Sequence, residues 1–285
     1  MYSISINAEK CNKCQKCTRV CSIGVIKSSD KKTPEILATE NCFRCGHCVA
    51  VCKPKAIEHS EFNYNNLITK NENVITGDKI ASFLATKRSC RIYKEQTILP
   101  DTWKKLLVSA AHAPSAFNCE DRAITVISDK NILKKIKIDL IKKIKKNLKL
   151  LKILQVRPFS WIFHKSTIEH FKKICLDFES TLHNCSQGID ALFHNAPHLV
   201  LVSSVGMDPL GKDNSLAAGH YVMLQAQSMG IGSAINGFVQ NTPKIISKHV
   251  KLPFMHKVFF AFTIGYPTIE YERSTERKEV LFNMI

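Results

Sequence analysis

The chain has 285 residues, of which 45% are hydrophobic and 23% charged, and its 41 Lys and Arg against 24 Asp and Glu give a formal net charge of +17. This composition is ordinary for a soluble globular protein. No stretch approaches the roughly 18 to 20 apolar residues of a membrane-spanning helix, so no transmembrane segment is expected. The length allows one sizeable core together with a small second domain.

Eight of the twelve cysteines form two copies of the spacing C-x2-C-x2-C-x3-C, in the order Cys11, Cys14, Cys17 and Cys21, then Cys42, Cys45, Cys48 and Cys52. This spacing holds cubane iron-sulfur clusters, because three closely spaced thiolates wrap one cubane while the fourth ligates the neighbouring cluster. Cys52 would then complete the cluster of the first copy, and Cys21 that of the second. The sequence therefore predicts two 4Fe-4S clusters, with all eight cysteines as metal ligands.

Two other uses of cysteine fit this pattern less well. A zinc ribbon needs two separated pairs and leaves no role for a third cysteine at the same interval. A disulfide framework needs an oxidising compartment, and the N-terminal sequence MYSISINAEK lacks the basic start, apolar stretch and cleavage site of a secretory signal. We therefore expect a cytoplasmic protein in a reducing setting.

Residues 1–62 resemble the bacterial two-cluster ferredoxins. The resemblance includes a short apolar strand at Ile4 and Ile6, before the first motif, and Cys52-Lys53-Pro54 after the second. One departure is Cys21-Ser22, where the family usually has Cys-Pro. Because that proline shapes a turn and is no ligand, a cluster is still expected. The next residues, 63–77, are polar and rich in asparagine, which predicts a linker.

The remainder of the chain alternates predicted helices and strands. Helices are expected from about Asp78 to Lys87 and from Pro100 to about His112, where proline in the first turn is a normal start. Short β-branched or apolar runs predict strands at 123–128, 199–203 and 258–264. Further helical stretches cover 130–153, 165–193, where a break is expected, and 216–229. These elements predict an α+β or α/β body.

The excess positive charge is concentrated in residues 130–153, which carry ten lysines against one acid, Asp139. Apolar residues recur there at the spacing of an amphipathic helix, namely Leu133, Ile136, Leu140, Ile141, Ile144, Leu148 and Leu151. The lysine face is either a solvated surface or a docking surface for an acidic protein, an anionic membrane or a nucleic acid. No interleaved aromatics or known binding module accompany the lysines, so a nucleic-acid partner is not expected.

A second site is indicated by the segment Lys87-Arg88-Ser89-Cys90-Arg91-Ile92-Tyr93. Three cations and a hydroxyl within five residues suit a phosphate, although basic residues also favour helix C-termini in their own right. No Gly-x-Gly-x-x-Gly follows a predicted strand, so a Rossmann site is not supported. Gly230-Ile231-Gly232 fits a helix C-cap instead.

Five segments in chain order resemble the FMN-dependent nitroreductase family over residues 78–285: RSCRIY, APSAFN, NAPHLVLV, GIGSAINGF, and IGYP with a basic tail. Nitroreductases with an N-terminal two-cluster ferredoxin are a known arrangement in that family. The resemblance implies an α+β fold. A ferredoxin-like two-cluster domain at 1–62 would be followed by an FMN-binding nitroreductase-type domain at 78–285, with a central, mainly antiparallel sheet wrapped by helices. It also implies a homodimer with FMN at the subunit interface.

The same resemblance assigns the FMN contacts. The phosphate and ribityl chain fall on Lys87, Arg88, Ser89 and Arg91, with Arg277 and Lys278 from the tail, and the flavin ring falls on Pro114, Ser115 and Asn118. The backbone amides of Asn236 and Gly237 would approach flavin N5 and O4, where a donor stabilises the reduced ring. Glu120-Asp121-Arg122 replaces the Gln-Pro-Trp of many relatives, which weakens the expectation of the usual nitroaromatic acceptors.

The resemblance thus predicts an iron-sulfur flavoprotein oxidoreductase. Electrons would pass from a reduced donor through both clusters to FMN, and then to a nitro compound, a quinone or an activated alkene. The donor is either a reduced ferredoxin or flavodoxin, or NAD(P)H. No catalytic side chain is assigned, and His112 and His220 are typical of structural histidines. The alternative is a non-catalytic electron carrier or redox sensor in which FMN relays electrons to a protein partner.

Overall fold

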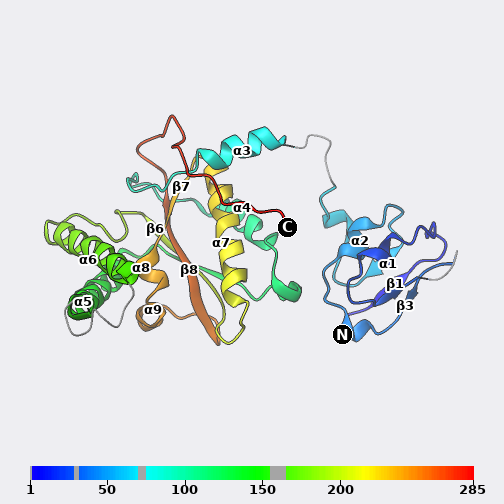
Figure 1. The fold of residues 1–285 in the computed structure, drawn as a ribbon. Coiled ribbons are helices and arrows are strands. Elements are labelled where there is room, and N and C mark those ends of the chain that lie inside the picture. Colours follow the sequence, from blue (N-terminus) through cyan, green and yellow to red (C-terminus); the bar gives the residue numbers. More distant parts are fainter. Residues whose placement is uncertain (1, 29–31, 70–74, 155–164) are drawn as a thin grey trace. The chain divides into compact units, whose positions relative to one another are not determined.

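The structure is a computed structural model of the chain and describes residues 2–28, 32–69, 75–154 and 165–285. The chain divides into two compact units, Met1–Thr76 with Ala116–Cys119, and Gly77–Ser115 with Glu120–Ile285 (Figure 1). The predicted linker at 63–77 includes residues 70–74, which lie outside the described residues, and the 3-10 turn η2 (Tyr64–Asn66). Domain limits at 62 and 78 remain a prediction.

The first unit contains two copies of a small motif, a cysteine loop followed by a short helix and a strand. Its elements are β1 (Ile4–Ile6), α1 (Lys16–Val20), β2 (Ile26–Lys27), β3 (Glu35–Ile36), the 3-10 turn η1 (Thr39–Asn41), α2 (His47–Val51) and β4 (Ile57–His59). Strand β1 pairs antiparallel with β4, and β2 with β3. Ile4, Ile26, Val49 and Ile57 are buried together in its core. The apolar strand predicted at Ile4 and Ile6 is therefore present.

The second unit is built on a four-stranded sheet in the order β5-β6-β8-β7. The strands are β5 (Ala123–Ile127), β6 (His198–Val205), β7 (Gly232–Ile235) and β8 (His256–Gly265), and every neighbouring pair is antiparallel. The three strands predicted from the sequence are present, with small shifts at their ends. The α+β prediction with a mainly antiparallel sheet is confirmed.

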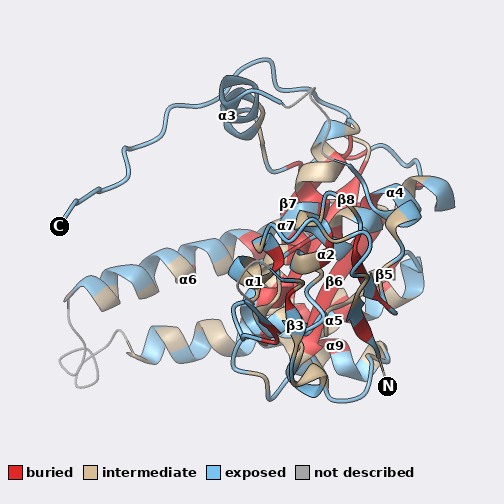
Figure 2. Cartoon of the chain, turned by 90° about the vertical axis from the view of Figure 1, so that its right-hand side faces the viewer, coloured by how far each residue is buried: buried red, intermediate tan, exposed pale blue. Residues whose placement is uncertain are grey.

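Helices cover both faces of this sheet. The helices of this unit are α3 (Gly77–Ala85), α4 (Pro100–Ala111), α5 (Lys130–Leu154), α6 (Lys165–Ser186), α7 (Gly211–Ser228), α8 (Gly237–Gln240) and α9 (Pro243–His249). Because side chains alternate along a strand, Val200 and Val202 of β6 face α4 and α7, whereas Leu199 and Leu201 face α5, α8 and α9. Figure 2 shows burial concentrated in the strands and exposure on the outer helix surfaces.

Several elements differ from the sequence prediction. Helix α7 begins at Gly211, five residues before the predicted start at Leu216, and strand β7 and helices α8 and α9 were not predicted at all. Helix α7 ends as expected: Gly230 has φ +70°, and the N–H of Ile231 donates to the carbonyl of Ala226 at 2.8 Å. Gly232 instead starts strand β7, where it pairs with Gly265 of β8.

Helix α5 has the predicted amphipathic form. Leu133, Ile136, Leu140 and Ile144 are buried in the core, whereas nine of the ten lysines are exposed. Lys137 is the exception, because its Nζ donates to Asp190 at 2.8 Å. In the part of the chain that the structure describes, no helix is long and apolar enough to cross a membrane.

Candidate functional site

The two cysteine motifs adopt the same backbone path. Each has left-handed residues at equivalent positions: Lys13 and Gln15 in the first motif (φ 60° and 58°), Arg44 and Gly46 in the second (φ 53° and 69°). These turns aim backbone amides at sulfur, since Lys13 N–H donates to Cys11 Sγ at 3.4 Å and Arg44 N–H to Cys42 Sγ at 3.3 Å. Peptide donors around thiolates are the usual surroundings of an iron-sulfur cluster.

The cysteines gather into two cavities, each drawing on both motifs. Cys11, Cys14 and Cys17 line one cavity together with Cys52. Cys42, Cys45 and Cys48 line the other together with Cys21. Three closely spaced cysteines and the last cysteine of the other motif therefore meet, as the spacing predicts. The assignment of the eight side chains as ligands remains a prediction.

The donor set and its surroundings fit cubane clusters. Four sulfurs surround each cavity, and the second is otherwise lined largely by apolar residues such as Ile4, Val25 and Ile26. Burial raises the pKa of the Cys17 thiol, and that of Cys48 to about 11. Thiolates at such positions need a nearby positive charge, which the iron of a cluster supplies.

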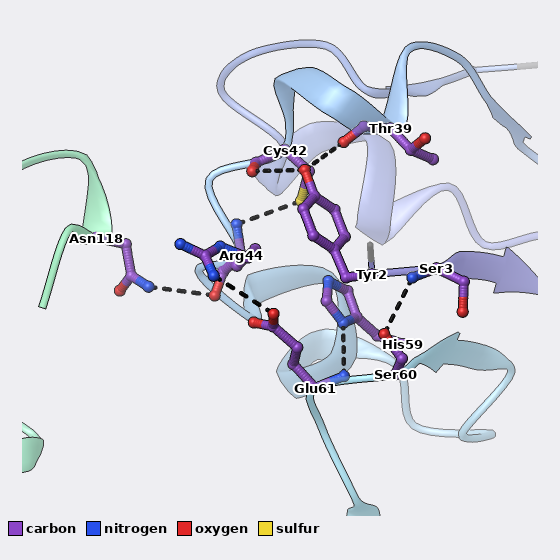
Figure 3. A network of polar contacts seen from close by, with 9 residues as sticks. All are labelled: Tyr2, Ser3, Thr39, Cys42, Arg44, His59, Ser60, Glu61 and Asn118. Carbon is purple, nitrogen blue, oxygen red and sulfur yellow. Dashed lines mark hydrogen bonds and ion pairs between the residues drawn. The ribbon is translucent and has the colours of Figure 1, made fainter.

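A polar network holds the N-terminal strand against the second motif (Figure 3). The Tyr2 hydroxyl lies 2.5 Å from the carbonyl oxygen of Thr39 and 3.1 Å from that of Cys42. Within this unit the Asn118 side-chain amide donates to the carbonyl of Arg44 at 3.2 Å. Asn118 was predicted to contact the flavin ring, and in this arrangement one of its amide hydrogens is used by Arg44.

The predicted phosphate residues follow helix α3 in the second unit. Lys87 Nζ donates to the carbonyls of Arg88 and Ser233 at 3.1 and 3.3 Å, and burial lowers the pKa of this lysine. The Arg88 guanidinium donates to Ala85 O at 2.8 Å and to Thr275 Oγ1 at 2.5 Å, while its Nε is buried with no partner among the described residues. Ser89 and Arg91 are exposed. This arrangement leaves donors at Arg88, Ser89 and Arg91 for an anion.

Strand β7 and the tail reach the same place. Ser89 forms a parallel bridge with Ser233 of β7, and that strand leads directly to Asn236 and Gly237. Thr275, bonded to Arg88, stands two residues before Arg277, and Arg277 and Lys278 are exposed. The structure thus brings together three of the predicted segments, from α3, from β7 and from the tail.

The backbone N–H and the side chain of Asn236 form hydrogen bonds within the second unit. Its backbone N–H donates to Ala261 O at 2.8 Å, and its side chain donates to Leu192 O at 2.7 Å and accepts from the Val239 N–H at 3.0 Å. This side chain caps α8. Gly237, the first residue of α8, is exposed. Of the two amides that the resemblance places at the flavin, the amide of Gly237 is the accessible one.

The loop after α4 carries Pro114 and Ser115, of which Pro114 is exposed and Ser115 half-buried. The Ser115 hydroxyl accepts the Glu120 N–H at 3.2 Å. Arg122 closes the C-terminal end of α4, because its guanidinium donates to the carbonyls of Ala110 and Ala111 at 3.1 and 2.7 Å. Arg122 thereby has a structural role at the helix end.

Two models of known protein families match this chain. The model of the nitroreductase family matches residues 84–266, more than half of the sequence. The chain belongs to the nitroreductase family. The model of the 4Fe-4S dicluster domain matches residues 3–53, which identifies the first unit as a two-cluster domain of that type. The family prediction is therefore confirmed in both parts, and no curated protein matches the chain.

Solved structures of similar fold are also nitroreductase-like. A nitroreductase with bound FMN from Desulfitobacterium hafniense is 13% identical, with a TM-score of 0.53 over 74% of this chain and 100% of that one. A BluB-like flavoprotein from Clostridium difficile is 17% identical, with a TM-score of 0.52 over 72% of this chain and 99% of that one. An FMN-dependent nitroreductase from the same species is 17% identical, with a TM-score of 0.50 over 73% of this chain and 100% of that one. At these identities the likeness concerns the fold.

Several residues that shape the nitroreductase domain were not found from the sequence. Tyr93 Oη donates to Cys90 O at 2.8 Å and lies 3.0 Å from Thr263 Oγ1, so it fixes the segment after Arg91 onto β8. Gly232 packs against Cys90, and a Cβ there would lie 2.7 Å from the Cys90 Cβ. Only glycine allows this approach of β7 to the basic segment. The one sequence signal was the position of Gly232 in the GIG triplet.

Proposed function

We propose that this protein is an iron-sulfur flavoprotein oxidoreductase that passes electrons from a reduced donor through two 4Fe-4S clusters to FMN and then to an organic acceptor. The observation that carries this proposal is the pair of cavities in which each cysteine triplet meets the last cysteine of the other motif, in a chain of the nitroreductase family. Clusters transfer single electrons, and FMN supplies the two-electron chemistry that a nitro group, quinone or activated alkene requires.

The proposed FMN site uses this chain's own donors. Arg88, Ser89 and Arg91 would bind the phosphate, with Arg277 and Lys278 from the tail, and Lys87 would hold the segment in place through Ser233. The Gly237 N–H would donate a hydrogen bond to the edge of the flavin ring, and Asn236 would hold Gly237 in position. Pro114, Ser115 and Asn118 would line the ring. The support is the FMN named for the solved structures from Desulfitobacterium hafniense and Clostridium difficile, together with the unpartnered Arg88 Nε.

A homodimer is part of this proposal. After β8 the described chain continues without helix or strand to Ile285, and it exposes Val280, Leu281, Phe282 and Met284 by 78 to 99%. A run of large apolar side chains so exposed is suited to burial against a second copy. We also infer a cytoplasmic location, because exposed clusters need a reducing compartment.

The donor is proposed to be a reduced, acidic carrier protein such as a ferredoxin or flavodoxin, with NAD(P)H as the other source. The lysine face of α5 favours the carrier, because opposite charges speed encounter. The same face supports a second candidate function, a non-catalytic carrier or redox sensor. That candidate requires slow turnover with every small acceptor and fast, salt-sensitive exchange with a protein.

Anaerobic stopped-flow spectroscopy on the reconstituted protein tests the proposal. The cluster and flavin bands are followed on mixing with NADH, NADPH or reduced ferredoxin, and then with nitroaromatic, quinone and enone acceptors. C11A and C42A should slow flavin reduction strongly, whereas C119A, outside both motifs, should not. Flavin reduction at the wild-type rate in C11A and C42A would refute the electron path, and zinc in place of iron would refute the clusters.

A further inference from the structure

His59 ends strand β4 beside the second cysteine cavity. The side chain is only 5% exposed, and it lines the cavity formed by Cys21, Cys42, Cys45 and Cys48. Its Nδ1 accepts the backbone N–H of Glu61 at 3.2 Å, as Figure 3 shows. A ring nitrogen that accepts this bond carries no hydrogen, so in the neutral ring the hydrogen is on Nε2.

That Nε2–H is buried and has no hydrogen-bond partner among residues 2–28, 32–69, 75–154 and 165–285. Buried donors are nearly always satisfied, because leaving one unpaired forfeits its bond to water. A neutral imidazole with one occupied nitrogen has one donor left to give.

The ring cannot easily turn away. It stacks on Tyr2 with centroids 5.8 Å apart and planes 3° from parallel, and it meets Phe62 edge-on at 4.9 Å. Tyr2 is itself held by the carbonyls of Thr39 and Cys42. In Figure 3 one ring nitrogen is directed at Glu61 and the other faces away from it. The orientation of Nε2 is thus fixed from both sides of the ring.

The internal repeat provides a comparison. Ile57 stands five residues after Cys52, as Ile26 does after Cys21, so the counterpart of His59 in the first half is Ser28. Ser28 is exposed, and its hydroxyl donates to Gln15 Oε1 at 3.3 Å. The first half therefore has no buried, unpaired donor at this position, and the two cavities differ.

We propose that the Nε2–H of His59 donates a hydrogen bond to a sulfur of the cluster held by Cys21, Cys42, Cys45 and Cys48, and thereby raises the reduction potential of that cluster above that of the other. Reduction adds negative charge to the cluster, and a fixed donor at sulfur stabilises that charge. The two clusters become unequal, so a single electron in the domain settles on this one. The inference rests on the proposed clusters and is independent of the flavin.

Redox titration of the full reconstituted chain, monitored by EPR, tests this inference. H59F keeps an aromatic ring against Tyr2 but has no N–H, and H59Q keeps a donor near the position of Nε2. In H59F one midpoint potential should fall by the equivalent of about a tenfold change in the reduction equilibrium, about 59 mV for one electron, while the other stays. H59Q should lie close to the wild type, and S28A should change neither potential.

Iron content separates the possible failures. If the wild-type protein bound no iron, the cluster assignment would be refuted, and the proposed function with it. H59F with full iron content and unchanged potentials would overturn the role of His59 alone.

A measurement on the wild type covers the case in which H59F does not assemble. Protein with ¹⁵N-labelled histidine should show a nitrogen coupling to one reduced cluster in pulsed EPR, and H47Q, which alters the exposed histidine of the same cavity, should retain it. Absence of any such coupling in the wild type would also refute the inference.

Discussion

The Asn214 side-chain amide donates to Oδ1 of Asp121 at 3.2 Å, and the other carboxylate oxygen accepts the Val205 N–H at 3.2 Å and the Ser204 hydroxyl. Asp121 thus ties the loop after α4 to the end of β6 and the first turn of α7. Of the charged triplet that was expected to influence the acceptor, Asp121 and Arg122 are used for structure. Glu120, which is exposed, is the member whose side chain reaches solvent.

D121A should therefore lower the free energy of unfolding of the nitroreductase domain by about 2 kcal/mol, because three donors lose a charged acceptor and Asn214 is only 3% exposed. E120Q should change it by less than about 0.5 kcal/mol, as is usual for exposed positions. Thermal or urea unfolding followed by circular dichroism measures both. A D121A protein of wild-type stability with altered acceptor preference would return Asp121 to a role in substrate selection.

His198 makes stability depend on pH. Its Nε2 accepts the Ile98 N–H at 3.0 Å and its Nδ1 lies 2.7 Å from Ser128 Oγ, so the buried ring is neutral, with the hydrogen on Nδ1. Burial lowers its pKa below 6.5. The unfolded chain therefore gains a proton first as the pH falls, and the stability present above pH 6.5 is lost as the pH drops toward the folded-state pKa.

In H198Q the unfolding midpoint should be lower at every pH but should fall less between pH 7 and 5 than in the wild type. His194, whose pKa is also lowered by burial, contributes in the same direction, so some slope remains. H183Q, at an exposed position of α6, is the matched control. Parallel curves for H198Q and wild type would show that His198 is not the titrating group.

Arg88 is expected to bind the FMN phosphate. R88M should raise the Kd for FMN about tenfold to a hundredfold, because a hydrogen bond to a charged group is worth about 1.5–3 kcal/mol. Riboflavin, which has no phosphate, should bind both proteins equally. R273M removes an exposed guanidinium whose ion-pair partner among the described residues is Glu272, at 3.7 Å, and should bind FMN normally. Fluorescence titration of the apoprotein gives all values, and equal weakening for riboflavin would make the role of Arg88 structural.

The sequence predicted the features that depend on short-range spacing. The first three cysteines of each motif line one cavity because each motif closes within eleven residues, and α5 follows from its apolar repeat. Strand β7 was not predicted from the sequence because Gly232-Ser233-Ala234-Ile235 is short, has mostly small side chains and is fixed by its pairing with β8. The roles of His59 and Asp121 were not predicted for a related reason, because their partners are defined by the tertiary fold. An alignment of the two halves of the first unit would nevertheless have placed His59 opposite Ser28.

The lysine face of α5 bears on the donor. Lys145, Lys146 and Lys149 are exposed, whereas Lys137, Lys142 and Lys152 are the lysines of this helix that form ion pairs among the described residues. If an acidic carrier docks there, replacing Lys145, Lys146 and Lys149 by glutamate should lower the rate of cluster reduction by reduced ferredoxin about tenfold or more at low salt. Electrostatic steering of this kind changes association rates by a factor of about 10 to 1,000.

The difference should shrink toward high salt, because the Debye length falls from about 10 Å at 0.1 M to about 3 Å at 1 M. A triple variant with glutamate at Lys105, Lys212 and Lys251, exposed lysines on other parts of the domain, has the same net charge and separates a local surface from a global field. Equal slowing in both variants would assign the effect to total charge. Unchanged rates in both would identify the lysine face as a solvated helix surface.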